Sequence, residues 1–214
     1  MFVSKPLLMP ILIVWAFLYS QENLIKINKL LMIALLFSMF GDISLMFLNY
    51  VPDMFLLGLL SFLIVHILYI YIFLKAPFRN SSSYIKKNPL ILITLICYGL
   101  CLILFLYKQN QPEFVQMQIP VIIYALVILL MLTSAINIYQ RNIRGMYLII
   151  LGAFLFVLSD STIALSQFSL LFNQKQDIAR IIIMCLYGIA QFMIVKGYLM
   201  STISYQSTPI KSNL

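Results

Sequence analysis

Charged residues are scarce in this chain of 214 residues: they make up 9% of it, and 6 of them are acidic. The chain also has one histidine, one tryptophan and 3 cysteines. A soluble domain of this size is excluded, because 63% of the residues are hydrophobic and long apolar stretches are typical of membrane proteins. The cysteines, Cys97, Cys101 and Cys185, lie inside apolar runs, where we interpret them as small buried hydrophobic side chains. We expect neither a disulfide nor a metal site from them.

The chain has apolar runs that are long enough to cross a bilayer. A spanning helix needs about 20 mostly apolar residues. Seven runs approach or reach this length, at residues 6–20, 30–49, 54–74, 89–107, 119–139, 146–168 and 178–200. Their side chains show no period of two, which argues against a transmembrane β-barrel. We therefore predict an all-α polytopic transmembrane helix bundle of about seven spans, which forms one integral membrane domain over residues 1–214.

The net charge of +8 is spread over short connections between the runs. This distribution fits membrane topology better than a nucleic-acid-binding surface, so we expect the lipid bilayer and no nucleic acid as partner. The connections after the first, third and fifth runs, and the tail, are richer in Lys and Arg than the others. The positive-inside rule then places the N-terminus outside and the C-terminus in the cytoplasm. The Ile-, Lys- and Asn-rich composition suggests a bacterial chain, and thus the plasma (inner) membrane.

Two of the acidic residues, Asp42 in SMFGDISLMF and Asp160 in FVLSDSTIAL, lie deep inside apolar runs. A carboxyl group near the centre of a spanning helix costs about 3 kcal/mol, and it usually faces the bundle interior for a functional reason. At about 1.5 Å per residue, Asp42 lies roughly 18 Å and Asp160 roughly 21 Å along helices that run in the same direction. We expect the two carboxyl groups to share one level of the bundle.

Further polar residues fall near the same depth in other runs. They are Ser38 and Asn49 on the face of Asp42, His66 with Tyr69, and Tyr187 with Gln191. Residues three or four apart are neighbours on a helix surface, so four helices can each present a polar patch. We predict a buried, water-containing polar pocket. Taken singly, these residues are also compatible with packing or interhelical hydrogen bonds, and Ser159 with a bond to backbone.

Several short motifs follow one another along the chain in an order that is typical of one protein family. Lys5-Pro6 opens a run, Gly41-Asp42 and His66 with Tyr69 follow, then Gly152 to Phe156 leads to Ser159-Asp160, and Tyr187 with Gln191 closes the series. Together, over about residues 4 to 200, they resemble the YhhN-like lysoplasmalogenase family of polytopic membrane enzymes. Family members usually carry one more span before the Lys-Pro segment, which gives eight.

The resemblance implies hydrolysis of the vinyl ether bond of lysoplasmalogens, which yields a fatty aldehyde and a glycerophospho-alcohol. It implies Asp42 and Asp160 as catalytic residues. The implied substrate-binding residues are His66, Tyr69, Ser159, Tyr187 and Gln191. The partner is then a lysophospholipid whose alkenyl tail enters laterally between helices, and we expect neither a cofactor nor a metal.

Vinyl ethers hydrolyse through protonation of the alkene carbon to an oxocarbenium ion, which water captures. This chemistry needs one protonated acid and one carboxylate, as glycoside hydrolysis does. Our hypothesis makes Asp160 the acid and Asp42 the base, with His66 bound to a carboxylate or to the phosphate. Since no arginine lies at pocket depth, a basic residue near a span end, such as Arg180 or Lys5, has to reach the phosphate.

Three other functions are compatible with the same residues. A proton-coupled transporter could use Asp42, His66 and Asp160 as a relay, although the sequence shows no inverted repeat. A metal hydrolase could use the same three residues, although no close-spaced ligand pair is present. A non-catalytic membrane scaffold would leave the two aspartates unexplained.

Overall fold

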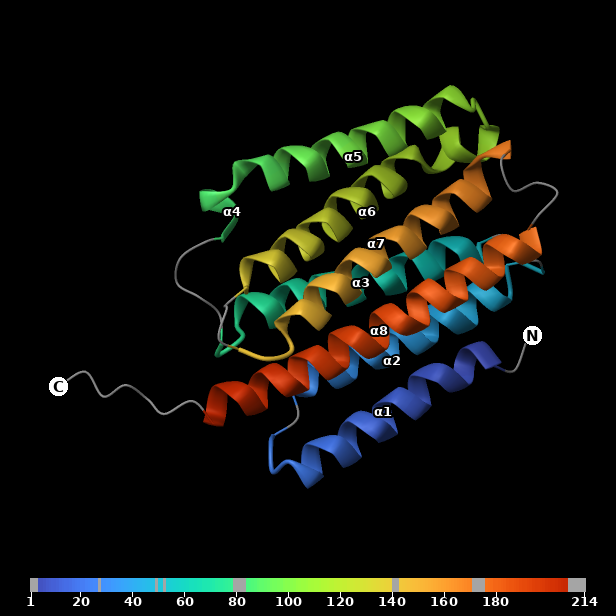
Figure 1. Ribbon diagram of the computed structural model, residues 1–214. Helices are drawn as coiled ribbons and strands as arrows, with labels where there is room; N and C mark the ends of the chain where they lie inside the picture. Colours follow the sequence, from blue (N-terminus) through green and yellow to red (C-terminus); the bar gives the residue numbers. More distant parts are fainter. Residues whose placement is uncertain are drawn as a thin grey trace.

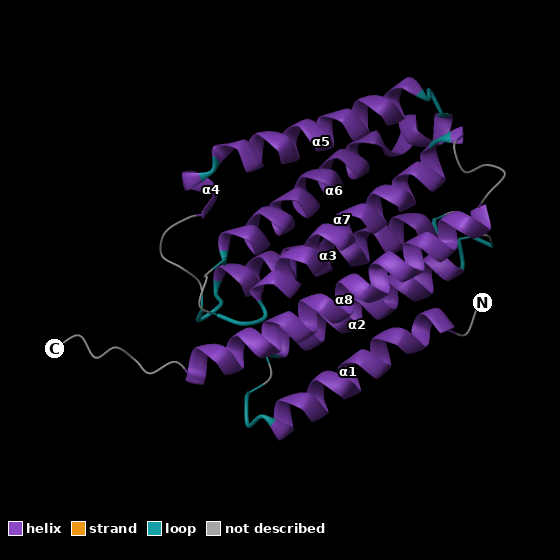
Figure 2. Ribbon diagram, viewed as in Figure 1, coloured by secondary structure: helices purple, strands orange, loops and turns teal. Residues whose placement is uncertain are grey.

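The computed structural model describes residues 4–26, 28–48, 50–51, 53–78, 84–139, 143–170 and 176–207. All regular structure within these residues is helical, and the long helices lie side by side in one bundle (Figure 1; Figure 2). The helices are α1 (Ser4–Glu22), α2 (Lys29–Met46), α3 (Met54–Leu74), α4 (Tyr84–Lys87), α5 (Pro89–Lys108), α6 (Pro112–Asn137), α7 (Met146–Phe168) and α8 (Gln176–Ser207). The predicted all-α bundle is confirmed. Helices α6 and α8 are longer than their apolar runs because each continues through a more polar stretch.

Local sequence explains where several helices begin. Pro89 and Pro112 open α5 and α6, where a missing backbone N–H costs nothing and the fixed φ suits a helix. The Asn28 side chain accepts a hydrogen bond from the Leu30 N–H and caps α2. Gly145, with a φ of 96°, turns the chain into α7 in the left-handed region that favours glycine.

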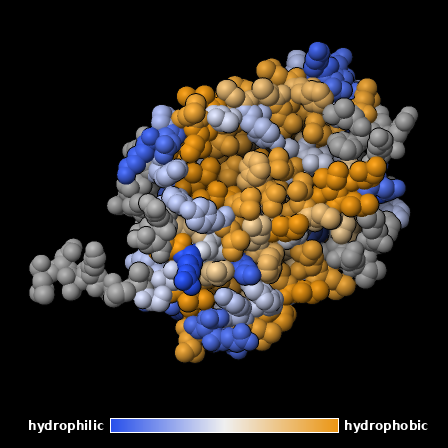
Figure 3. Space-filling view, in the orientation of Figure 1, coloured by the Kyte–Doolittle hydropathy of each residue, from blue (hydrophilic) through white to orange (hydrophobic). Residues whose placement is uncertain are grey.

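The outer surface of the bundle is apolar. Six of the described helices are long and apolar enough to cross a membrane, and α1 contributes a shorter apolar stretch, Leu7–Glu22. Figure 3 shows a broad hydrophobic face with hydrophilic residues gathered toward its margins. Side chains such as Ile67, Leu100 and Leu126 are at least half exposed on this surface. An apolar surface of this extent requires lipid around it, so the chain is an integral membrane protein.

The prediction that the cysteines are buried is wrong. Cys97, Cys101 and Cys185 are all free thiols on the outer surface of the bundle. The two on α5 are exposed because this helix packs at the edge of the bundle (Figure 1), with 6% of its most apolar stretch buried. Their apolar surroundings are therefore lipid rather than protein core.

Glycines allow the helices that carry the aspartates to pack closely against their neighbours. A Cβ atom at Gly152 on α7 would lie 2.8 Å from the carbonyl oxygen of Ala190 on α8. A Cβ at Gly41 on α2 would lie 2.9 Å from the Phe62 ring on α3. Small residues at such contacts let membrane helices approach each other. These contacts bring the polar residues of α2, α3, α7 and α8 within hydrogen-bonding distance of one another.

Candidate active site

Asp42 and Asp160 line the same small cavity in the bundle interior. The carboxyl groups come from α2 and α7, and the two residues are 6% and 8% exposed. The cavity has a volume of about 20 Å³, and Ser159 and Tyr187 line it as well. About 10–15 Å³ is enough to hold one water molecule that has polar partners. The structure thus brings two residues that are far apart in sequence to one site with room for a water.

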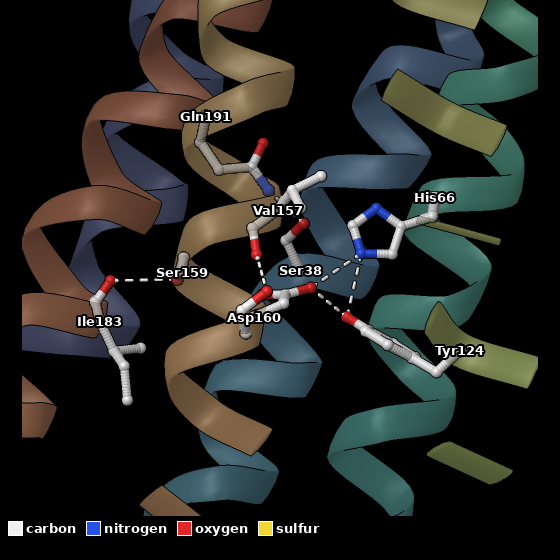
Figure 4. Close-up of polar contacts among 9 residues, drawn as sticks. Ser38, His66, Tyr124, Val157, Ser159, Asp160, Ile183 and Gln191 are labelled. Atoms are coloured by element: carbon white, nitrogen blue, oxygen red, sulfur yellow. Dashed lines mark hydrogen bonds and ion pairs between the residues drawn. The ribbon is translucent and has the colours of Figure 1, made fainter. Parts of the chain in front are cut away.

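Two donors from other helices hold the Asp160 carboxyl group (Figure 4). His66 Nε2 on α3 lies 3.0 Å from Asp160 Oδ2, and the Tyr124 hydroxyl on α6 donates to the same oxygen. The Tyr124 hydroxyl also lies 2.9 Å from His66 Nε2. The three groups form a closed triangle that fixes the Asp160 carboxyl group in one orientation.

The other ring nitrogen of His66 identifies the tautomer. Among the described residues, His66 Nδ1 is the buried side-chain nitrogen or oxygen that has no hydrogen-bond partner. A buried N–H without a partner costs more than a buried lone pair does. A neutral imidazole with its proton on Nε2 therefore fits the site best, and this form donates to Asp160. The ring is held by an edge contact with Phe156, with a centroid distance of 4.7 Å.

A second hydrogen-bonded chain leads to Asp42. The Tyr69 hydroxyl donates to Gln191 Oε1 over 2.5 Å, and Gln191 Nε2 donates to Ser38 Oγ over 2.8 Å. Ser38 lies four residues before Asp42 on the same face of α2, and the Tyr187 hydroxyl donates to Asp42 Oδ2 over 3.0 Å. Gln191 therefore uses both ends of its amide, one on a residue of α3 and the other on a residue of α2. Residues of α2, α3 and α8 are thereby locked together beneath Asp42.

Aromatic rings lie beside both carboxyl groups. Phe62, Phe156 and Tyr187 contact one another edge to face, with centroid distances of 5.5 to 6.4 Å. Phe62 and Tyr187 line the small cavity, where their apolar ring surfaces lower the local dielectric. Aromatic faces also attract a positive charge, which a cationic intermediate would carry.

The residues predicted to bind substrate have different roles in the structure. His66, Tyr69, Tyr187 and Gln191 all join the two networks, whereas Ser159 donates to the Ile183 carbonyl over 3.3 Å while it lines the cavity. That bond is the ordinary role of a serine in a spanning helix. Asn49 and the Lys5 side chain lie outside the described residues.

Sequence reasoning missed Tyr124. Tyrosines in membrane helices are commonest near the lipid headgroups. From the sequence, we did not distinguish Tyr124 from such interfacial tyrosines. Its position was nevertheless a signal, because it lies well inside α6, twelve residues after Pro112 in a run of aliphatic side chains. A tyrosine at this depth needs a buried partner for its hydroxyl.

Two further cavities adjoin the site. The larger, which we call the vestibule, has a volume of about 600 Å³ and lies where α2 and α7 end and α3, α6 and α8 begin. The smaller, of about 40 Å³, is apolar, and Asp160 and Tyr124 border it together with Leu59 and Val121. We call the small cavity that Asp42 and Asp160 share the candidate catalytic cavity. Four apolar residues border both this cavity and the vestibule, and we call them the collar. The collar is Leu45, Ile163, Ile183 and Met184.

Comparisons with known proteins identify the family of the chain. No curated protein and no solved structure is significantly similar to the chain. The YhhN family model, however, matches residues 1–198, which include every residue of the two networks. The chain therefore belongs to the YhhN family.

Proposed function

We propose that this protein is a membrane hydrolase that cleaves the vinyl ether bond of lysoplasmalogens and releases a fatty aldehyde and a glycerophospho-alcohol. The observation that carries the proposal is the cavity of about 20 Å³ that Asp42 and Asp160 share. It offers an acid, a base and space for the water that the reaction consumes. Membership of the YhhN family supports a hydrolase of this kind.

Asp160 is the acid that starts the reaction. It borders both the catalytic cavity and the apolar cavity of about 40 Å³, where the first carbons of the alkenyl chain would lie. His66 and Tyr124 both bind Oδ2, so Oδ1 carries the proton that is transferred. Transfer to the alkene carbon leaves the Asp160 carboxylate and an oxocarbenium ion, which the carboxylate and the aromatic rings stabilise.

Asp42 is the base that activates water. It lines the catalytic cavity, and Tyr187 and the chain through Ser38 and Gln191 fix its position. As water attacks the oxocarbenium carbon, its proton passes to Asp42 and a hemiacetal forms. The hemiacetal hydroxyl then returns a proton to Asp160, and Asp42 protonates the departing glycerol oxygen. Both aspartates end as they began, and one water has been consumed.

A proton-coupled transporter is the second candidate, and the contact of 3.0 Å between His66 and Asp160 favours it. A transporter must open its relay to both ends of the bundle in turn. On the side of Tyr69 and Gln191 away from the vestibule, the next layer consists of fully buried apolar side chains. These are Leu31, Leu35, Ile72 and Ile194. This one-sided arrangement favours a hydrolase that takes in substrate from the vestibule.

The test is aldehyde release by the purified protein in detergent. A lysophospholipid with a vinyl ether should be cleaved and one with a saturated ether should not, since only the former can be protonated to an oxocarbenium ion. Asp42→Asn and Asp160→Asn should each lower turnover by at least about a hundredfold, because general acid–base catalysis contributes about 10²–10⁴.

Glu22→Gln is the matched control, since Glu22 is an exposed acid at the end of α1 and lines none of the three cavities. It should keep wild-type turnover. Near-normal turnover of Asp42→Asn or Asp160→Asn would remove that residue from the mechanism. Substrate-dependent proton uptake in proteoliposomes without aldehyde release would favour the transporter.

A further inference from the structure

We propose that the vestibule is the binding site for the phospholipid headgroup, with Arg180 as the residue that binds the phosphate and Asp53 and Glu113 as the acids that attract the ammonium group. The site would select a zwitterionic phosphodiester headgroup. The link to catalysis rests on the proposed function, whereas the binding itself can be tested alone.

The collar separates the vestibule from the catalytic cavity by one helical turn. Leu45 follows Asp42 by three residues, Ile163 follows Asp160 by three, and Ile183 precedes Tyr187 by four. Residues at these spacings are stacked on one helix face. A lipid with its ether bond at the aspartates would therefore pass the collar with its glycerol unit and place its headgroup in the vestibule.

Arg180 lies at the right depth to meet the phosphate. It lines the vestibule from α8 and precedes Tyr187 by seven residues, which is about 10 Å along the helix. The long arginine side chain covers part of this distance, and the glycerol unit covers the rest. Its guanidinium group can bind phosphate oxygens in a bidentate manner.

The ion pair between Arg180 and Asp177 can be exchanged for a contact with phosphate. Arg180 Nη1 lies 3.5 Å from Asp177 Oδ1, and the side chains are 43% and 85% exposed. Exposed ion pairs of this kind contribute little to stability. A lipid phosphate, bound in a more enclosed position beside the apolar collar, can replace it at small cost.

The acidic side chains that line the vestibule carry negative charge, which can attract an ammonium group. Asp53 precedes α3, and Glu113 lies in the first turn of α6. Both are exposed and line the vestibule. The described lining thus offers one cation and two anions, which complements a phosphate followed by an ammonium group. A phosphate monoester, with more negative charge and no ammonium, would be repelled by the two acids.

The experiment measures binding of saturated-ether lysolipids, which cannot react, to the purified full-length protein in detergent. Three probes are compared: 1-O-alkylglycerophosphoethanolamine, 1-O-alkylglycerophosphate and 1-O-alkylglycerol. Wild type should bind the ethanolamine lipid most tightly. Arg180→Ala should weaken that binding about tenfold or more, because it removes the charge-assisted hydrogen bonds to the phosphate. Its affinity for alkylglycerol should not change.

Matched variants distinguish a specific phosphate-binding site from non-specific electrostatic attraction. Arg180→Lys should recover part of the affinity. Lysine keeps the positive charge but lacks the planar guanidinium group that can bind two phosphate oxygens at once. Lys108→Ala removes an exposed cation at the end of α5, outside the vestibule lining, and should have no effect. The double variant Asp53→Asn, Glu113→Gln should lower the ratio of the affinity for the ethanolamine lipid to the affinity for the phosphate monoester. Thermal melting confirms that each variant is folded.

The outcomes distinguish this inference from the proposed function. Equal loss with Lys108→Ala and Arg180→Ala, or no loss with Arg180→Ala, overturns the headgroup site even if the vinyl ether is cleaved. Binding that depends on Arg180, in a protein that releases no aldehyde, supports the headgroup site and overturns the hydrolase alone.

Discussion

At the scale of single residues, the site consists of two aspartates with different partners. Asp160 is held by a histidine and a tyrosine from α3 and α6, and Asp42 by a tyrosine from α8. Buried carboxyl groups are costly unless they are hydrogen-bonded. The partners therefore make the two acids tolerable in the bundle and also fix where each one points.

Tyr124 is the residue whose removal tests the Asp160 network. Tyr124→Phe deletes the hydroxyl that binds Asp160 and His66 and keeps the ring. Loss of a hydrogen bond to a charged group costs about 1.5–3 kcal/mol, so we expect kcat to fall by about tenfold or more. The measurement is aldehyde release over a range of substrate concentrations, with KM expected to change less than kcat.

Tyr98→Phe is the control for this substitution. The Tyr98 hydroxyl lies 2.7 Å from Ser161 Oγ, so the variant also loses an interhelical hydrogen bond, but away from the cavity. It should keep wild-type kcat. Equal effects of the two variants would show that Tyr124 acts through general helix packing.

At the scale of helices, the spacing between α7 and α8 decides whether Asp160 and Tyr187 line the same cavity. Gly152→Val should disturb this spacing, since even a Cβ would lie 2.8 Å from the backbone of Ala190. Overpacking of this kind typically costs about 1–3 kcal/mol. We expect a lower melting temperature together with lower turnover.

Gly99→Val on α5 is the control, because the Cβ there would meet the end of the flexible Leu129 side chain at 2.6 Å rather than backbone. That side chain can move aside, so stability and turnover should stay close to wild type. A Gly152→Val protein with unchanged melting and turnover would contradict the proposed role of close packing.

The collar lies between the vestibule and the aspartates, so its bulk should limit access from one to the other. Ile163→Phe adds bulk at a position that borders the vestibule, the catalytic cavity and the apolar cavity. We expect kcat/KM for a long-chain lysoplasmalogen to fall by about tenfold or more, whereas hydrolysis of ethyl vinyl ether should fall much less. A difference of about 1.4 kcal/mol in access corresponds to tenfold.

Ile67→Phe on the outer face of α3 makes the same change where the side chain is 50% exposed, and it should alter neither rate. If Ile163→Phe leaves the long-chain substrate unaffected, substrate must reach the aspartates by another way, such as laterally between helices.

At the scale of the whole molecule, the orientation in the membrane remains a prediction of the charge pattern. The connections that are rich in Lys and Arg place the C-terminus in the cytoplasm. A green fluorescent protein fused to the C-terminus of the full chain should then fluoresce in bacterial cells, while an alkaline phosphatase fusion there should be inactive. The opposite pair of results would invert the topology and put the vestibule on the cytoplasmic side.

The sequence alone determined that this protein is a bundle of membrane helices with two costly acids in its interior. Composition and the length of the apolar runs are sufficient for this conclusion. Only helices and closed β-barrels can span a bilayer, and burial of a carboxyl group there costs much free energy. The common depth of Asp42 and Asp160 also followed from helix geometry, since rise per residue depends little on context.

The tertiary structure decided which side chains meet. Helix rotation and spacing come from contacts between distant segments, such as Gly152 with Ala190, and local periodicity does not contain them. For this reason Tyr124 could not be assigned to Asp160, and the cysteines of α5 could not be recognised as facing lipid. The vestibule, the collar and the shared cavity exist only where several helices converge, so three-dimensional packing alone defines them.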